Sequence, residues 1–135
     1  MSLTISPAAL EQRVLNVLQN HGFTEENARA VAQVITAGER DGCKSHGLYR
    51  LEGCLKVTAA GKASGTSVPQ IHDAGGAIIE VAAGGGFAPA SFVAGKDLLA
   101  ARARELLSPV IAALAMSLSS VSVIGNALRL RGQKL

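Results

Sequence analysis

The strongest constraint on this chain is a run of 23 residues near its C-terminus, 106–128, in which no side chain is charged. A helix of this composition is apolar on nearly every face, so it must be buried in something. Its length suits a membrane span, which needs about 20 apolar residues, and Arg129 and Arg131 follow it as flanking cations do. Four serines in its middle and Asn126 count against a span. We expect a hydrophobic C-terminal helix within 106–135, covered either by lipid, over 106–128, or by protein.

Charge is distributed in a way that argues against nucleic-acid binding. The 135 residues carry a net charge of +3, yet through Leu128 ten Lys and Arg balance ten Asp and Glu. The excess therefore lies in Arg129, Arg131 and Lys134, outside any folded basic face. Aromatic residues are only 3% of the chain, too few for base-stacking platforms. We expect no nucleic-acid partner.

The two cysteines, Cys43 and Cys54, do not form a CxxC motif and are too few for a disulfide framework. We interpret both as small buried residues. The N-terminal sequence MSLTISPAALEQR lacks the basic and apolar regions of a signal peptide. These features predict a cytoplasmic protein, with the membrane as the alternative if 106–128 spans a bilayer.

Apolar periodicity and capping residues predict a mixed α/β chain that begins with three helices. Ser6-Pro7 opens a helix over 7–21, and Thr24 caps a second helix over 25–40. The third helix is predicted from near Ser45 to Ala60. Extended segments at Pro69–His72 and Ala77–Ala82 predict a hairpin, and Pro89 starts a helix to about Leu107.

Chemically useful residues are concentrated in the stretch DGCKSHGLYR, residues 41–50. On a helix from Ser45, His46 and Arg50 are four residues apart and share a face. A histidine that gives a proton, beside an arginine that binds a carboxylate through two hydrogen bonds, suits reduction of a C=N or C=O next to a carboxylate. Ser45 would orient the ring or relay its proton. A capping histidine and a solvated arginine are the structural alternatives.

Two other patterns have structural interpretations. His21, His46 and His72 are scattered without metal-ligand spacing, so we expect no metal site. Gly84-Gly85-Gly86 follows a predicted strand and precedes a helix, as in phosphate-binding loops, but it lacks GxGxxG spacing and a following GK[ST]. We interpret it as a tight turn.

The anchors Ser45-His46-Gly47 with Arg50, then Gly61, the strand at Pro69-Gln70, and Gly85-Gly86-Phe87 resemble the amino-terminal part of the type-2 malate/L-lactate dehydrogenase family. Within that family, residues 5–105 are most similar to Δ1-piperideine-2-carboxylate/Δ1-pyrroline-2-carboxylate reductases. The resemblance implies a family-specific fold that is not a Rossmann domain. It also implies hydride transfer from NADPH or NADH to a cyclic 2-imino acid or a 2-oxo acid, in a metal-free cytoplasmic homodimer.

Carried over by the same resemblance, His46 is the proton donor, Ser45 its relay partner, and Arg50 the ligand of the substrate carboxylate. The resemblance assigns no cofactor-binding residue here.

The chain departs from the family pattern after about residue 105. Residues 107–135 resemble instead the last transmembrane helix of copper-transporting P-type ATPases, and we expect the two parts to join near Arg104 to Leu107. We therefore divide the chain into 1–105, the N-terminal part of a dehydrogenase-like domain, and 106–135, a hydrophobic helix. A fusion, a shifted reading frame or a remnant would explain the join, and we expect weak or no turnover. The alternative is a membrane-anchored or interaction protein without catalysis.

Overall fold

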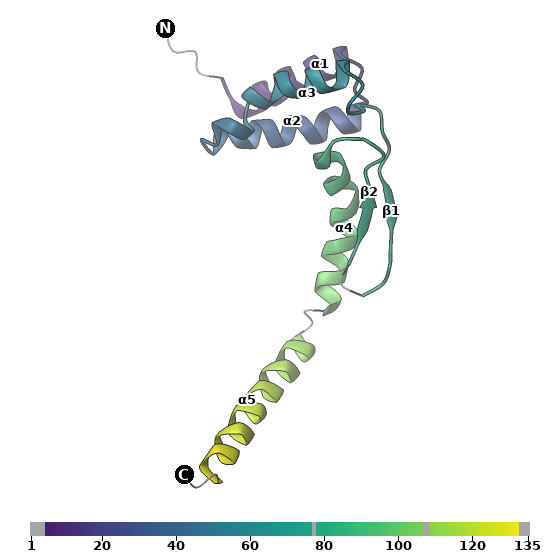
Figure 1. The fold of residues 1–135 in the computed structure, drawn as a ribbon. Coiled ribbons are helices and arrows are strands. Elements are labelled where there is room, and N and C mark those ends of the chain that lie inside the picture. The colour runs from purple at the N-terminus through teal and green to yellow at the C-terminus, as the bar shows by residue number, and fades with distance from the viewer. Residues whose placement is uncertain (1–4, 77, 107–108, 133–135) are drawn as a thin grey trace.

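The computed structural model describes residues 5–76, 78–106 and 109–132. Ala77, Leu107, Ser108 and Lys134, which enter several of the expectations above, lie outside these residues. Three α-helices and a short 3-10 turn are followed by an antiparallel hairpin and two more helices (Figure 1). The elements are α1 (Pro7–Asn20), α2 (Glu25–Arg40), η1 (Lys44–His46), α3 (Tyr49–Ala59), β1 (Gln70–His72), β2 (Glu80–Ala82), α4 (Ala88–Leu106) and α5 (Pro109–Gly132).

The first two helices begin where their capping residues predicted. Ser6 Oγ accepts a hydrogen bond from the N–H of Ala9 at 3.3 Å, and Thr24 Oγ1 accepts one from Asn27 at 3.4 Å. Each bond satisfies an amide that the helix itself leaves without a partner. Gly22 lies in the connection between the two helices. Its φ of 85° is in the left-handed region, which favours glycine.

The core lies between α1 and α2, and α3 covers part of it. Its members are apolar side chains at helical spacing, and the alanines among them let the two helices approach closely. Each large aliphatic side chain buried here contributes about 1.5–3 kcal/mol. The buried cluster consists of Val14, Leu15, Leu18, Phe23, Ala28, Val31, Ala32 and Ile35, with Leu10, Leu51, Cys54, Leu55 and Phe87 half-buried against it.

The third helix begins later than the sequence predicted. Ser45 and His46 belong to the 3-10 turn η1, and the α-helix starts only at Tyr49. Gly47, at φ −86° and ψ −143°, separates the two elements in a non-helical conformation. The predicted single helix over 45–60 is therefore wrong in its first turn.

The predicted hairpin is confirmed, with shorter strands. Gln70 pairs with Ala82, Ile71 with Val81, and His72 with Glu80. Helix α4 packs directly on β2, because a Cβ added to Gly95 would lie only 2.8 Å from Val81 Cγ2. The structure is thus mostly helical, with one small sheet of two strands.

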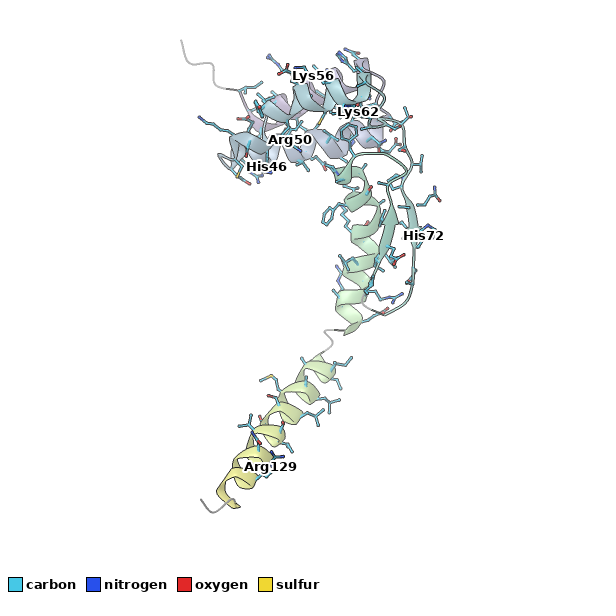
Figure 2. All side chains as sticks on the ribbon, in the orientation of Figure 1. His46, Arg50, Lys56, Lys62, His72 and Arg129 are labelled. Carbon is cyan, nitrogen blue, oxygen red and sulfur yellow. The ribbon has the colours of Figure 1, made fainter. Side chains whose placement is uncertain are left out.

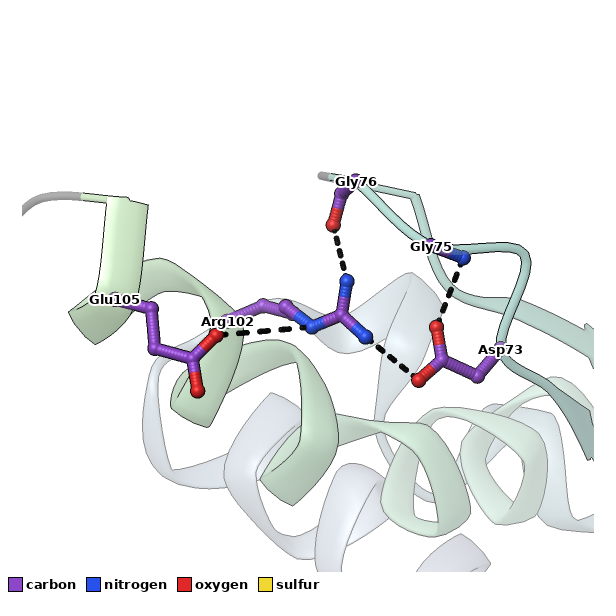
Figure 3. A network of polar contacts seen from close by, with 5 residues as sticks. All are labelled: Asp73, Gly75, Gly76, Arg102 and Glu105. Atoms are coloured by element: carbon purple, nitrogen blue, oxygen red, sulfur yellow. Dashed lines mark hydrogen bonds and ion pairs between the residues drawn. The ribbon is translucent and has the colours of Figure 1, made fainter.

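Arg102 of α4 holds the tip of this hairpin (Figure 3). Its guanidinium donates to the carbonyl oxygen of Gly76 at 2.7 Å and to Asp73 Oδ2 at 2.6 Å. Asp73 Oδ1 in turn accepts from the N–H of Gly75 at 3.0 Å. One half-buried cation therefore joins a helix to a glycine-rich turn 26 residues away in sequence.

Asn27 joins α2 to the loop that precedes the hairpin. This residue is 4% exposed, and its side-chain amide donates to the carbonyl oxygens of Gly65 at 2.8 Å and Ser67 at 2.9 Å. The N–H of Thr24 also donates to Gly65 at 3.1 Å. The start of α2 thereby satisfies two carbonyls of an irregular segment, which fixes where the hairpin leaves the helical layer.

Helix α5 extends away from the other elements (Figure 1). Between Val110 and Ile124 its large apolar side chains are 47–73% exposed, so the burial that the sequence demands is not provided by the described part of the chain. Among the described residues no single helix is long and apolar enough to cross a membrane. Only Ala88–Glu105 and Val110–Ile124 taken together, with a bend of 55° between them, have the required length and composition.

The single membrane span expected over 106–128 is therefore not supported. The physical reason is length: on its own, Val110–Ile124 falls short of the about 20 apolar residues that a span needs. Four serines lie in the middle of the run. Two of them, Ser117 and Ser120, donate their hydroxyls to the helix backbone at Ala113 (2.9 Å) and Met116 (3.1 Å).

We predict that Asn27→Ala lowers the free energy of unfolding by about 1–3 kcal/mol, because two carbonyl oxygens lose their buried donor. Asn16→Ala is the matched control: its amide oxygen accepts only from exposed Gln12, and we expect a change within about 0.5 kcal/mol. Urea denaturation followed by circular dichroism measures both. Equal effects of the two substitutions would contradict the role of Asn27.

Candidate active site

The candidate site is built on the turn that links α2 to α3. The N–H of Cys43 donates to the carbonyl oxygen of Gly38 in the last turn of α2 at 2.8 Å. The N–H of His46 then donates to the carbonyl oxygen of Cys43, also at 2.8 Å. The turn is therefore hydrogen-bonded to α2 and to itself, which presents Ser45 and His46 at the surface.

Gly38 lets the backbone of this turn lie directly against α2. A Cβ at Gly38 would be 2.7 Å from both the carbonyl carbon and the carbonyl oxygen of His46, and 2.9 Å from the nitrogen of Gly47. These atoms are backbone and cannot rotate away. Sequence reasoning missed this residue, although a glycine inside a helix costs about 1 kcal/mol relative to alanine and so signals a packing reason.

Ser45 and His46 form a hydrogen-bonded pair. Ser45 Oγ lies 3.0 Å from His46 Nδ1, and both residues are exposed. When Ser45 donates to Nδ1, the ring proton of neutral histidine lies on Nε2, and that proton can leave only if Nδ1 receives one from Ser45. The structure thus places the two predicted partners in contact.

Arg50 lies on the first turn of α3 and lines a hollow of about 370 Å³. The hollow is also lined by Tyr49, Cys54, Val57 and Phe87, none of which the sequence assigned to a binding site. Burial raises the pKa of the Cys54 thiol, and the positive charge of Arg50 partly opposes that rise. The Arg50 guanidinium thus lies close enough to influence a thiol in the same hollow. A cation beside apolar side chains could bind a carboxylate that is attached to a ring.

The three predicted residues do not form one enclosed site. His46 and Arg50 lie at the same end of the helical layer (Figure 2), but neither Ser45 nor His46 lines the hollow that contains Arg50. The expected face shared by His46 and Arg50 on one helix is wrong, because they belong to different elements. The arrangement provides an exposed Ser45–His46 pair and, close to it in sequence, a hollow lined by the Arg50 guanidinium.

The triple-glycine turn is tied to the loop that precedes the hairpin. Ser67 Oγ donates to the carbonyl oxygen of Gly84, and the N–H of Ser64 donates to that of Gly85 at 2.9 Å. Within the turn, the N–H of Gly86 donates to the carbonyl oxygen of Ala83 at 2.9 Å. These contacts fit the tight turn that the sequence predicted.

In the part of the chain that the structure describes, no group of three or more His, Cys, Asp or Glu side chains could hold a metal ion. His72 lies on β1, away from His46 (Figure 2). The expectation that the protein needs no metal stays a prediction.

The model of the malate/L-lactate dehydrogenase family matches residues 5–122, which includes the candidate site and continues beyond residue 105.

Individual relatives are similar over the same region. A Δ1-pyrroline-2-carboxylate reductase of Agrobacterium fabrum is 45% identical over 104 residues, which are 76% of this chain and 30% of that protein. A Δ1-pyrroline-2-carboxylate/Δ1-piperideine-2-carboxylate reductase of Pseudomonas aeruginosa is 39% identical over 108 residues, 80% of this chain and 31% of that protein. The chain thus spans somewhat less than a third of the length of the curated relatives it matches.

Solved structures share the fold. The Δ1-piperideine-2-carboxylate reductase of Pseudomonas syringae pv. tomato superposes with a TM-score of 0.75 at 34% identity, over 77% of this chain and 31% of that one. Malate dehydrogenase of Pyrococcus horikoshii superposes with a TM-score of 0.69 at 19% identity, over 76% of this chain and 30% of that one, which shows likeness of fold alone.

We predict that Gly38→Ala lowers the free energy of unfolding by about 1–3 kcal/mol and shifts the NMR resonances of the His46 ring, because the added methyl group overlaps the backbone of the turn. Gly53→Ala is the matched control. Nothing lies within 4 Å of a Cβ there, and alanine is the better helix former by about 0.5–1 kcal/mol. A stable Gly38→Ala variant with unshifted His46 resonances would contradict the close approach.

Proposed function

Because the chain belongs to the malate/L-lactate dehydrogenase family, we propose that it carries the proton-donor and carboxylate-binding residues of a reductase acting on a cyclic 2-imino acid. Δ1-Pyrroline-2-carboxylate and Δ1-piperideine-2-carboxylate are the proposed substrates, with 2-oxo acids as a second substrate class. The relatives named for these activities support this choice.

Reduction of the C=N bond adds a hydride to carbon and a proton to nitrogen. The proposed proton donor is His46 through Nε2. As that proton passes to the imine nitrogen, the Ser45 hydroxyl passes its own proton to Nδ1 and, being exposed, takes a replacement from solvent, so the ring stays neutral. The hydrogen bond between Ser45 Oγ and His46 Nδ1, at 3.0 Å, is the observation that carries the proposal. The Arg50 guanidinium would bind the carboxylate, which orients the C=N bond toward His46.

The hydride would come from NADPH or NADH. The open hollow at Arg50 needs a cover that excludes water, and the homodimer implied by the family resemblance would supply one. A cytoplasmic location belongs to the same proposal.

We expect the purified chain to bind pyrrole-2-carboxylate, a planar mimic of the imino acid, and to oxidise NADPH weakly or not at all. Arg50→Gln should weaken this binding by about tenfold or more, because the carboxylate loses a charged donor. His46→Ala should change the NMR chemical shift of the ring nitrogen of bound pyrrole-2-carboxylate. Titration by heteronuclear NMR measures both effects.

Two exposed residues provide matched controls for this titration. Arg29→Gln removes an arginine that pairs with Glu25 on α2, and His72→Ala removes a histidine on β1. Neither should alter affinity by more than about twofold. Binding that is insensitive to Arg50, or equally sensitive to Arg29, would show that the carboxylate binds elsewhere.

A second candidate function is attachment to a membrane or to another protein through α5. The exposure of its apolar side chains from Val110 to Ile124 favours this, and Arg129 near its end suits an anionic lipid surface.

Cell fractionation separates the two candidates. We expect a membrane-attached chain to sediment with the membranes and to be released by detergent but not by high salt, because apolar contacts are not screened by ions. A chain ending at residue 106 is the control and should stay in the supernatant. Recovery of the full chain in the supernatant would exclude membrane attachment.

A further inference from the structure

Glu39, in the last turn of α2, reaches across to the start of α3. Its Oε1 accepts a hydrogen bond from the backbone N–H of Leu48 at 2.7 Å. Leu48 is the N-cap residue that immediately precedes α3, and its own side chain makes no capping hydrogen bond. The carboxylate therefore does for α3, from a neighbouring helix, what Ser6 and Thr24 do for α1 and α2.

Gly47 makes room for this contact. The residue is buried, and a Cβ added to it would overlap the carboxylate of Glu39. A larger residue at this position would therefore displace the Glu39 carboxylate from its place beside the backbone. The neighbouring cation does not compete for Glu39, because Arg40 donates to both oxygens of Asp41, at 2.8 and 3.1 Å.

The backbone fixed in this way is the connection between the two halves of the candidate site. His46 lies two residues before Leu48, and Arg50 lies two residues after it. The N–H of Arg50 donates to the carbonyl oxygen of Gly47 at 2.9 Å, so the first turn of α3 starts from the segment that Glu39 holds. A negative charge at this helix start is also favoured by the helix dipole.

We propose that Glu39 is a positioning residue of the site: its carboxylate sets the separation between the His46 ring and the Arg50 guanidinium by fixing the backbone at Leu48. The claim that this separation serves a substrate rests on the proposed function. The carboxylate itself touches neither substrate nor reacting atoms.

The test uses the full isotope-labelled chain and NMR. Three quantities are measured: the hydrogen-exchange rate of the Leu48 amide, the ring resonances of His46 with His21 and His72 as references, and the affinity for pyrrole-2-carboxylate. In Glu39→Ala we expect Leu48 exchange to rise about tenfold, the His46 resonances alone to shift, and affinity to fall about tenfold.

Glu39→Gln should restore most of all three quantities, since its amide oxygen still accepts from Leu48. Glu39→Asp keeps the charge on a side chain one methylene shorter, so it should fall between wild type and alanine, and it replaces Glu39→Ala if that variant does not fold. Glu26→Ala, an exposed carboxylate at the other end of α2, is the control and should change each quantity by less than about twofold.

Two results would overturn the proposal: unchanged Leu48 exchange, or faster exchange with unshifted His46 resonances and unchanged affinity. A wild-type chain that does not bind the analogue, yet shows the His46 shift in Glu39→Ala, would refute the proposed function while supporting the positioning role. The two failures are therefore distinguishable.

Discussion

The buried face of α2 is the constraint on which the rest of the structure depends. Its alanines and Ile35 pack against α1, and the amide of Asn27 at one end holds the loop that leads to the hairpin. At the other end, the absence of a side chain at Gly38 lets the backbone of the turn with His46 pack against the helix. One helix thus connects the core to both irregular segments. Burial of apolar surface supplies most of the stability, while the buried hydrogen bonds decide which loop conformation is compatible with it.

This arrangement explains why Ser45 and His46 are held in a defined geometry while the hollow around Arg50 is open to solvent. The backbone of the turn at 43–47 is held by hydrogen bonds to α2, so Ser45 and His46 have a defined relation to each other. The hollow around Arg50 is formed by α3 and Phe87 and is separate from that pair. The chain spans somewhat less than a third of the relatives it matches, and its exposed donor pair and open hollow are consistent with a site completed by further surface.

The C-terminal helix poses the opposite problem, since its composition demands burial that the described residues do not provide. Serine hydroxyls that bond back to the backbone make α5 compatible with an apolar environment. The family match extends into this helix as far as residue 122, past the boundary near 105 that the resemblance predicted.

The sequence by itself determined α1, α2, the hairpin and α4 to within a few residues, because caps, glycines and apolar periodicity are local signals that each segment carries. It also identified Ser45 and His46 as partners, since neighbours in sequence remain neighbours in space. It could not predict that α3 starts at Tyr49, that Gly38 carries the turn, or that Arg50 lines a hollow with Phe87. Those features depend on contacts between segments distant along the chain, and only tertiary packing decides which backbone groups find partners there.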